Sequence, residues 1–162
     1  MKKVNVTIIC LAEEEYPGCA DLVESYPEIH LVASCSALDE AGLRNALENS
    51  DILLLDQAVV EVEGAEKVRT LHHNHPGLRS LLIIEKNCEI NAMAAISLGI
   101  RGMMERVSMV SMLRKAIAVL YSGEAWVSRD MVQLLQIQSK YLNDRSVWLA
   151  HPVTLPECGK FN

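Results

Sequence analysis

Asp51-Ile-Leu-Leu-Leu-Asp56 is the segment from which the fold of this chain can best be predicted. Four consecutive apolar residues between two aspartates are too few for a typical globular helix, and they are typical of a strand that is buried on both faces. Strands of that kind lie in the middle of parallel sheets. Asp56 then stands at the carboxyl end of the strand, which is the edge where open α/β sheets place their ligands and chemistry.

Segments of the same kind recur along the chain and alternate with helical patterns. The predicted strands cover residues 4–10, 29–35, 51–56, 80–84 and 101–104. The predicted helices cover residues 19–26, a segment between Ser36 as N-cap and Leu47, residues 64–73, a segment between Ile90 and Gly99, and residues 109–120. Because the connections are short and crossovers between parallel strands are right-handed, this alternation predicts an α/β fold. Its five-stranded parallel sheet carries helices on both faces.

Composition and charge bound the class of protein. The 162 residues suffice for one domain with a full core and a short appendage, and a half-apolar chain with only 4% aromatic residues suits α/β layers. The net charge of −6, with scattered Lys and Arg, disfavours nucleic acid and anionic membranes as partners. The five cysteines form no CxxC pair, and the sequence shows neither a signal peptide nor a membrane-spanning run. We therefore expect a soluble cytoplasmic protein with reduced thiols.

A carboxylate at the tip of a central strand can act as a nucleophile towards phosphoryl groups. That reaction needs a divalent cation, because the transferred group carries dense negative charge. In a five-stranded α/β fold the carboxylates that hold the cation should come from the tip of the neighbouring first strand. That tip reads Cys10-Leu11-Ala12 and contains no carboxylate.

Several motifs together resemble one protein family. They are Val23-Glu-Ser-Tyr-Pro-Glu-Ile29, Asp51-Ile-Leu-Leu-Leu-Asp56, His75-Pro-Gly-Leu78, Leu98-Gly-Ile-Arg-Gly102 and Ser122-Gly-Glu-Ala-Trp-Val-Ser128. With these motifs at family spacing, residues 4–128 resemble a receiver domain of the response regulators, in the branch joined to LuxR/NarL-type DNA-binding domains. The resemblance implies a flavodoxin-like fold with strand order 2-1-3-4-5 and a role in bacterial two-component signalling and transcription regulation.

The resemblance implies that Asp56 occupies the phosphoacceptor position, but the rest of the family's site is changed. Cys10 and Leu11 occupy the positions of the family's two metal-binding acids. Ile84 replaces the hydroxyl residue of the fourth strand, and Met103 replaces the switch aromatic of the fifth strand. Arg106 occupies the position of the invariant lysine. Mg²⁺ prefers oxygen ligands, so we expect its binding to be weak or absent, and we expect no other cofactor. The changes indicate a degenerate pseudo-receiver in which Asp56 pairs with Arg106, rather than an enzyme.

Three alternatives remain open at this point. Glu13, Glu14 or Glu15 could reach the site if the following Pro17-Gly18 reshapes the loop. Asp56 could still accept phosphate in a phosphorelay, from a histidine kinase or a small phosphodonor. The site could also sense a small molecule, because a pocket lined by Cys10, Leu11 and Ile84 would be apolar.

Methionines cluster in the segment that, by the resemblance, forms the face on which family members pair. We expect a partner face there, and a homodimer formed either by this face or by the C-terminal helix. The residues of this predicted face are Met93, Met104, Met109 and Met112. The competing interpretation is that these methionines only fill the hydrophobic core.

We interpret His72, His73 and His75 as a polar surface cluster rather than a metal site, and Cys10 and Cys35 as inert buried thiols.

The domain organisation follows from the same patterns. We expect a receiver domain over residues 1–126, a linker helix over 127–143 and a tail over 144–162. The tail holds no recognition helix, so we expect no specific DNA binding by this chain alone.

Overall fold

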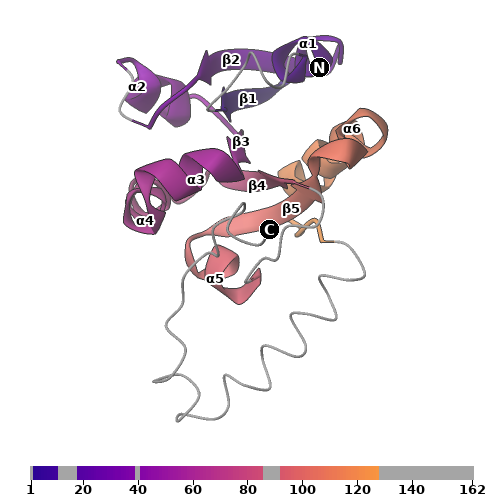
Figure 1. Ribbon diagram of the computed structural model, residues 1–162. Helices are drawn as coiled ribbons and strands as arrows, with labels where there is room; N and C mark the ends of the chain where they lie inside the picture. The colour runs from indigo at the N-terminus through magenta and orange to yellow at the C-terminus, as the bar shows by residue number, and fades with distance from the viewer. Residues whose placement is uncertain (1, 11–17, 39–40, 86–91, 128–162) are drawn as a thin grey trace.

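The computed structural model describes residues 2–10, 18–38, 41–85 and 92–127 of the chain. Over these residues the chain forms a five-stranded parallel sheet with the order β2-β1-β3-β4-β5, as predicted (Figure 1). The strands are β1 (Val4–Ile9), β2 (Ile29–Cys35), β3 (Ile52–Asp56), β4 (Arg79–Ile84) and β5 (Ile100–Glu105). The helices are α1 (Cys19–Glu24), α2 (Leu43–Glu48), α3 (Gln57–Glu63), α4 (Ala65–Asn74), α5 (Ala92–Ser97) and α6 (Met109–Tyr121), with a 3₁₀ turn η1 (Arg106–Ser108) before α6.

Strand β3 lies at the centre of the sheet, between β1 and β4. All five of its residues are buried, which explains why its sequence is continuously apolar and does not alternate. Leu53 and Leu55 enter one hydrophobic core, and Ile52 and Leu54 enter the other, because successive residues of a strand point to opposite faces. The central strand therefore links the two cores of the domain.

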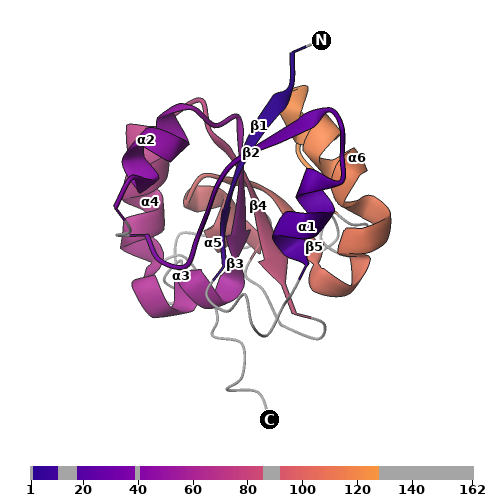
Figure 2. The ribbon, with the colours of Figure 1, turned by 90° about the horizontal axis from the view of Figure 1, so that it is seen from above.

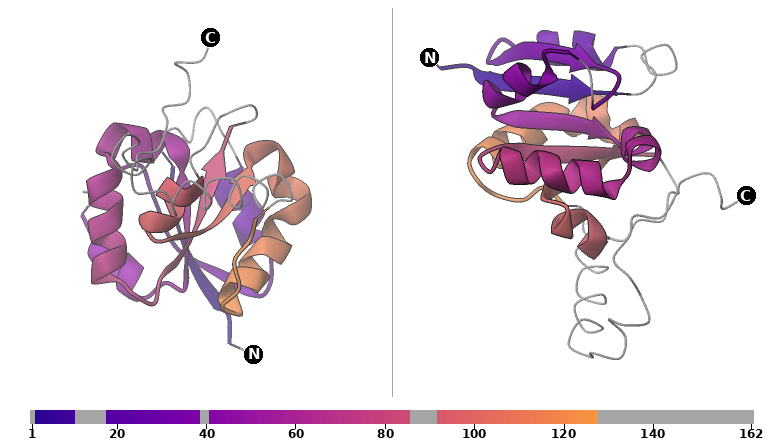
Figure 3. Two further views of the ribbon diagram at one scale, coloured as in Figure 1. Left: turned by 90° about the horizontal axis from the view of Figure 1, so that it is seen from below. Right: turned by 90° about the vertical axis from the view of Figure 1, so that its left-hand side faces the viewer.

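Helices cover the two faces of the sheet unequally. Side chains of α2, α3, α4 and α5 build the first core, and side chains of α1 and α6 build the second. Figure 2 shows α1 and α6 together on one side of the sheet, with α2, α3 and α4 on the other. The two views in Figure 3 show the same separation from other sides. The expected architecture of helices on both faces is confirmed.

The helices differ from the sequence-based prediction in some bounds and in number. Helix α1 ends at Glu24, two residues before the predicted end, and α4 is shifted by one residue. Helix α2 begins at Leu43 after Gly42, whose φ of 87° lies in the left-handed region, so Ser36 is not its N-cap. Helix α3 was not predicted as a separate element. It follows β3 without a loop, because the Asp56 side chain caps it by accepting a hydrogen bond from the Ala58 N–H.

The described ranges contain no helix that is long and apolar enough to span a membrane. The predicted linker helix and tail fall, apart from Val127, outside the described residues.

Candidate functional site

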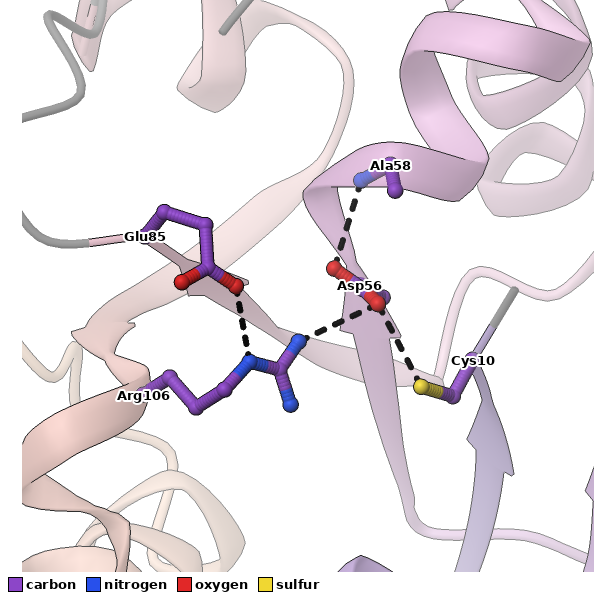
Figure 4. A network of polar contacts seen from close by, with 5 residues as sticks. All are labelled: Cys10, Asp56, Ala58, Glu85 and Arg106. Carbon is purple, nitrogen blue, oxygen red and sulfur yellow. Dashed lines mark hydrogen bonds and ion pairs between the residues drawn. The ribbon is translucent and has the colours of Figure 1, made fainter. Parts of the chain in front are cut away.

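Asp56 stands where the sequence predicts it, at the carboxyl end of β3. Its carboxylate is almost fully buried, with 6% of the side chain exposed. One oxygen, Oδ1, accepts the Ala58 N–H at 3.2 Å and so fixes the carboxylate at the start of α3. The other oxygen, Oδ2, faces the tips of β1 and β5 (Figure 4).

Arg106 is the cation of this site, as predicted from the sequence. It follows β5 directly, and its Nη2 lies 3.1 Å from Asp56 Oδ2. Its Nε donates a hydrogen bond to Glu85 Oε1 at 2.8 Å (Figure 4). Burial alone would lower the pKa of Arg106, but the hydrogen bond to Glu85 and the negative charge of Asp56 outweigh it and raise the pKa above its ordinary value. Arg106 therefore stays charged and joins the ends of β3, β4 and β5.

Sequence reasoning missed Glu85. It is the residue directly after β4, and its side chain is 46% exposed. Ile83 pairs with Asp56 in the register of β3 and β4, and residues two apart in a strand share a face, so Glu85 continues the row that faces the site. The pairing of β3 with β4 would have identified Glu85 as a residue of this site, but one sequence alone does not reveal that pairing.

Cys10 completes the network from the tip of β1. Its thiol donates a hydrogen bond to Asp56 Oδ2 at 3.3 Å, and its side chain is buried. Oδ2 thus contacts both Cys10 and Arg106. Cys35 lies beside Cys10 on the neighbouring strand, where its carbonyl accepts the Cys10 N–H, but its side chain enters the opposite core.

The space beside Asp56 is small. The cavity there has a volume of about 10 Å³, which is about the space of one water molecule. Its lining comprises Ile8, Ile9, Cys10, Cys19, Leu54, Asp56, Ile83 and Arg106. Ile84 and Met103 pack in the opposite core, so the expectation that Ile84 shares a pocket with Cys10 is wrong. Successive residues of β4 point to opposite faces of the sheet, so Ile84 points away from the face that Ile83 shares with the cavity. Leu11 lies outside the described residues.

The described residues around Asp56 supply few of the oxygen ligands that a magnesium ion prefers. Asp56 and Glu85 are the carboxylates that the described residues bring to this network, and the guanidinium of Arg106 stands between them. A hard divalent cation needs several oxygen ligands and would be repelled by this charge. Within the described ranges, no group of three or more His, Cys, Asp or Glu side chains could hold a metal ion.

The methionines of the predicted partner face divide into two pairs. Met104 and Met109 are buried in the core beneath α6, so the expectation of a surface role is wrong for these two. Alternation along β5 turns Met104 inward, and Met109 lies on the inner face of α6. Met93 and Met112 are half-buried and stay candidates.

A different stripe, apolar except for a central arginine, is exposed on η1 and α6. Its members recur every three or four residues, which places them along one side of the helix: Val107, Val110, Arg114, Ala118 and Tyr121. Val107 is 68% exposed and Val110 is 82% exposed. Arg114 in the middle bonds through two nitrogens to both carboxylate oxygens of Glu28, and its guanidinium lies 5.7 Å from the centre of the Tyr26 ring.

His72 does not belong to a surface cluster, contrary to the sequence-based interpretation. Its ring is half-buried, with Nδ1 2.9 Å from the Val68 carbonyl and Nε2 2.5 Å from the Ser80 hydroxyl. A carbonyl only accepts, so Nδ1 carries the proton, and the Ser80 hydroxyl donates to Nε2. Burial, with a smaller effect from the charge of His75, lowers the pKa of His72 in spite of its backbone hydrogen bonds.

Solved structures resemble this chain over most of its length. A two-component response regulator of the LuxR family from Aurantimonas sp. SI85-9A1 is 19% identical, with a TM-score of 0.69 over 85% of this chain and 99% of that one. The isolated REC domain of RcsB from Salmonella enterica serovar Typhimurium is 19% identical, with a TM-score of 0.66 over 83% of this chain and 99% of that one. RcsB dimers bound to two parallel DNAs give a TM-score of 0.65 at 19% identity, over 83% of this chain and 69% of that one.

Neither a protein-family model nor a curated protein sequence matches this chain. At identities below one fifth, the likeness to solved structures concerns the fold. The sheet order, the helices on both faces and the near-complete coverage of isolated REC domains all agree. The chain has the five-stranded, flavodoxin-like fold of response-regulator receiver domains.

Proposed function

We propose that this chain is a receiver module of bacterial two-component signalling that acts by protein–protein contact, without phosphorylation of Asp56. The observation that carries the proposal is the occupation of both Asp56 oxygens. Oδ1 accepts the Ala58 N–H, and Oδ2 contacts both Arg106 and Cys10. The carboxylate is held in a closed network within the chain itself.

Phosphoryl transfer to Asp56 would meet three obstacles. The attacking oxygen would have to leave Arg106 or the cap of α3. The cavity of about 10 Å³ is far smaller than a phosphoryl group with its incoming donor. Cys10, a thiol, stands on the strand tip where an acid would have to hold the cation. Each obstacle raises the barrier, because positioning and charge neutralisation supply most of the catalysis in this reaction.

The test is phosphorylation by a small phosphodonor. The full chain is incubated with acetyl phosphate and Mg²⁺, and its intact mass is followed beside a receiver domain that has its full set of acids. We expect the control to gain a phosphoryl group and this chain to remain unmodified. A stoichiometric adduct that disappears in Asp56→Asn would overturn the proposal and favour the rival function, a phosphoaccepting receiver in a phosphorelay. A small-molecule sensor gains no support from so small a cavity.

We propose further that the chain forms a homodimer through the stripe on η1 and α6. The spacing of the stripe is symmetric about Arg114. Val110 and Ala118 each lie four residues from Arg114, and Val107 and Tyr121 each lie seven residues from it. A two-fold axis at Arg114 therefore sets Val107 of one copy opposite Tyr121 of the other, and Val110 opposite Ala118. Glu28 neutralises each Arg114, so the two guanidinium groups can approach across the axis. RcsB, whose fold is similar, binds DNA as dimers.

Light scattering after size-exclusion chromatography tests the dimer. We expect wild type to be dimeric at tens of micromolar and Val110→Glu to be monomeric, because two like charges would enter an apolar contact. Val62→Glu is the matched control, since Val62 is also a well-exposed valine (66%) but lies on α3, away from the stripe. A monomeric wild type, or a Val62→Glu variant that dissociates as readily as Val110→Glu, would contradict the proposed surface.

A further inference from the structure

Two thiols line the small cavity beside Asp56. Cys10 is buried at the tip of β1, and Cys19 is half-buried at the start of α1. Both line the same space of about 10 Å³, together with Asp56 and Arg106. A volume of that size admits a molecule not much larger than water. The function proposed above uses Cys10 only as a contact of Asp56 and assigns no reaction to either thiol.

The charges around Cys10 act in opposite directions on its reactivity. The thiolate is the nucleophilic form of cysteine, and a neighbouring guanidinium favours it. Arg106 provides that positive charge within the cavity. Asp56 accepts the thiol hydrogen at 3.3 Å and so favours the protonated form. The resting network therefore holds a nucleophile beside its activating cation and keeps it protonated.

We propose that Cys10 and Cys19 form a redox-sensitive pair that a small hydroperoxide converts into a disulfide. This inference goes beyond the proposed function and is independent of the dimer. At the carboxyl edge of the sheet, the residue that is covalently modified is then Cys10, which lies beside Asp56, and not Asp56 itself. Formation of the disulfide removes the Cys10 thiol from Asp56 Oδ2, so the oxidation state of the pair changes the network that Arg106 holds together.

The reaction balances in two steps. The Cys10 sulfur attacks one oxygen of hydrogen peroxide, so that an S–O bond forms, the O–O bond breaks, and hydroxide leaves with the former thiol proton as water. The Cys19 sulfur then attacks the Cys10 sulfur, the S–S bond forms, the S–O bond breaks, and a second water leaves with the Cys19 proton. The two thiols lose two electrons in total, and one peroxide is reduced to two waters.

The sequence makes the pair easy to map. The three cysteines of the described residues are separated by glutamates: Glu13, Glu14 and Glu15 lie between Cys10 and Cys19, and Glu24 and Glu28 lie between Cys19 and Cys35. Cleavage after glutamate therefore places each of them on its own peptide. The full chain is treated with a small excess of hydrogen peroxide, alkylated, digested and analysed by mass spectrometry with and without reduction.

We expect a Cys10–Cys19 cross-linked peptide that reduction removes. Cys19→Ser should stop the reaction at a Cys10 sulfenic acid, which dimedone traps. Cys35→Ser is the matched control and should leave the cross-link unchanged, because its side chain lies in the opposite core. Asp56→Asn should speed Cys10 oxidation about tenfold, because it removes the negative charge that disfavours the thiolate. Circular dichroism confirms that each variant is folded.

Two results would overturn the inference. One is that, after hydrogen peroxide treatment, Cys10 and Cys19 are still alkylated while the other cysteines of the chain are oxidised. The other is a Cys10 oxidation rate that Asp56→Asn leaves unchanged or lowers. Both readouts are independent of the phosphodonor experiment, so either proposal can fail while the other stands.

Discussion

Replacement of Arg106 by glutamine tests the central network most directly. The side chains of Asp56 and Arg106 are 6% and 15% exposed, so their ion pair lies largely out of water. Without Arg106, the donors that the described residues offer the Asp56 carboxylate would be the Cys10 thiol and the Ala58 N–H. Removal of one partner of a fully buried pair costs about 3–5 kcal/mol because the remaining charge is uncompensated. With Arg106 partly exposed, we expect Arg106→Gln to lower the free energy of unfolding by about 2–3 kcal/mol.

A double-mutant cycle isolates the pair from other effects of the substitution. Asp56→Asn alone should cost about 1–2 kcal/mol, since Arg106 keeps its hydrogen bond to Glu85 while the asparagine still caps α3. The double variant should be more stable than the sum of the two single costs predicts, by about 1–2 kcal/mol. Urea denaturation followed by circular dichroism measures all four proteins.

Arg69→Gln provides the comparison. Arg69 also pairs with a carboxylate, that of Glu66, but their side chains are 43% and 82% exposed. Its loss should change the free energy of unfolding by less than about 0.5 kcal/mol. If Arg106→Gln costs no more than Arg69→Gln and the cycle shows no coupling between Arg106 and Asp56, the buried pair does not stabilise the fold.

Two further predictions concern the contact between α4 and the start of β5. The pKa of His72 is lowered in the folded state, so the unfolded chain binds its proton first and stability should fall as the pH drops through about 6.5. Melting temperatures between about pH 7.5 and pH 5 should show this slope in wild type and in His73→Gln, but a reduced slope in His72→Gln. Gly99→Ala should cost about 1–3 kcal/mol in urea denaturation, because the new Cβ would lie 2.7 Å from His72 Cβ at a φ of 99°. Gly77→Ala, which meets no atom within 4 Å, should change stability by less than about 0.5 kcal/mol, and equal costs for the two glycines would contradict the close approach.

Elements with a strong apolar period could be predicted from the sequence almost residue by residue. The strand predicted over 29–35 is β2 with the same bounds, and the helix predicted over 109–120 is α6 with one more residue. Burial is the reason, because apolar residues recur with the helical repeat on a helix face that meets the core, and form an alternating or continuous apolar run in a buried strand. The pairing of Asp56 with Arg106 was also predicted, since the family resemblance places these two residues at the phosphoacceptor and invariant-lysine positions of one site.

The features that the sequence did not reveal depend on tertiary register or on competing local preferences. Helix α3 contains Val59, Val60 and Val62, whose branched side chains favour strands, and it is helical because Asp56 caps it and two of these valines enter the core. Glu85 faces the network while Ile84 points away, and only the pairing of β3 with β4 fixes that alternation.

Ribosomal synthesis delivers Asp56 well before its cation. Asp56 ends β3, whereas Arg106 follows β5, the last of the five strands that the described residues form. A nascent chain that has emerged only as far as β4 would bury an uncompensated carboxylate if it closed this edge of the sheet, and such burial is costly. We therefore expect this edge of the sheet to close only when β5 is in place, because Arg106 then neutralises Asp56.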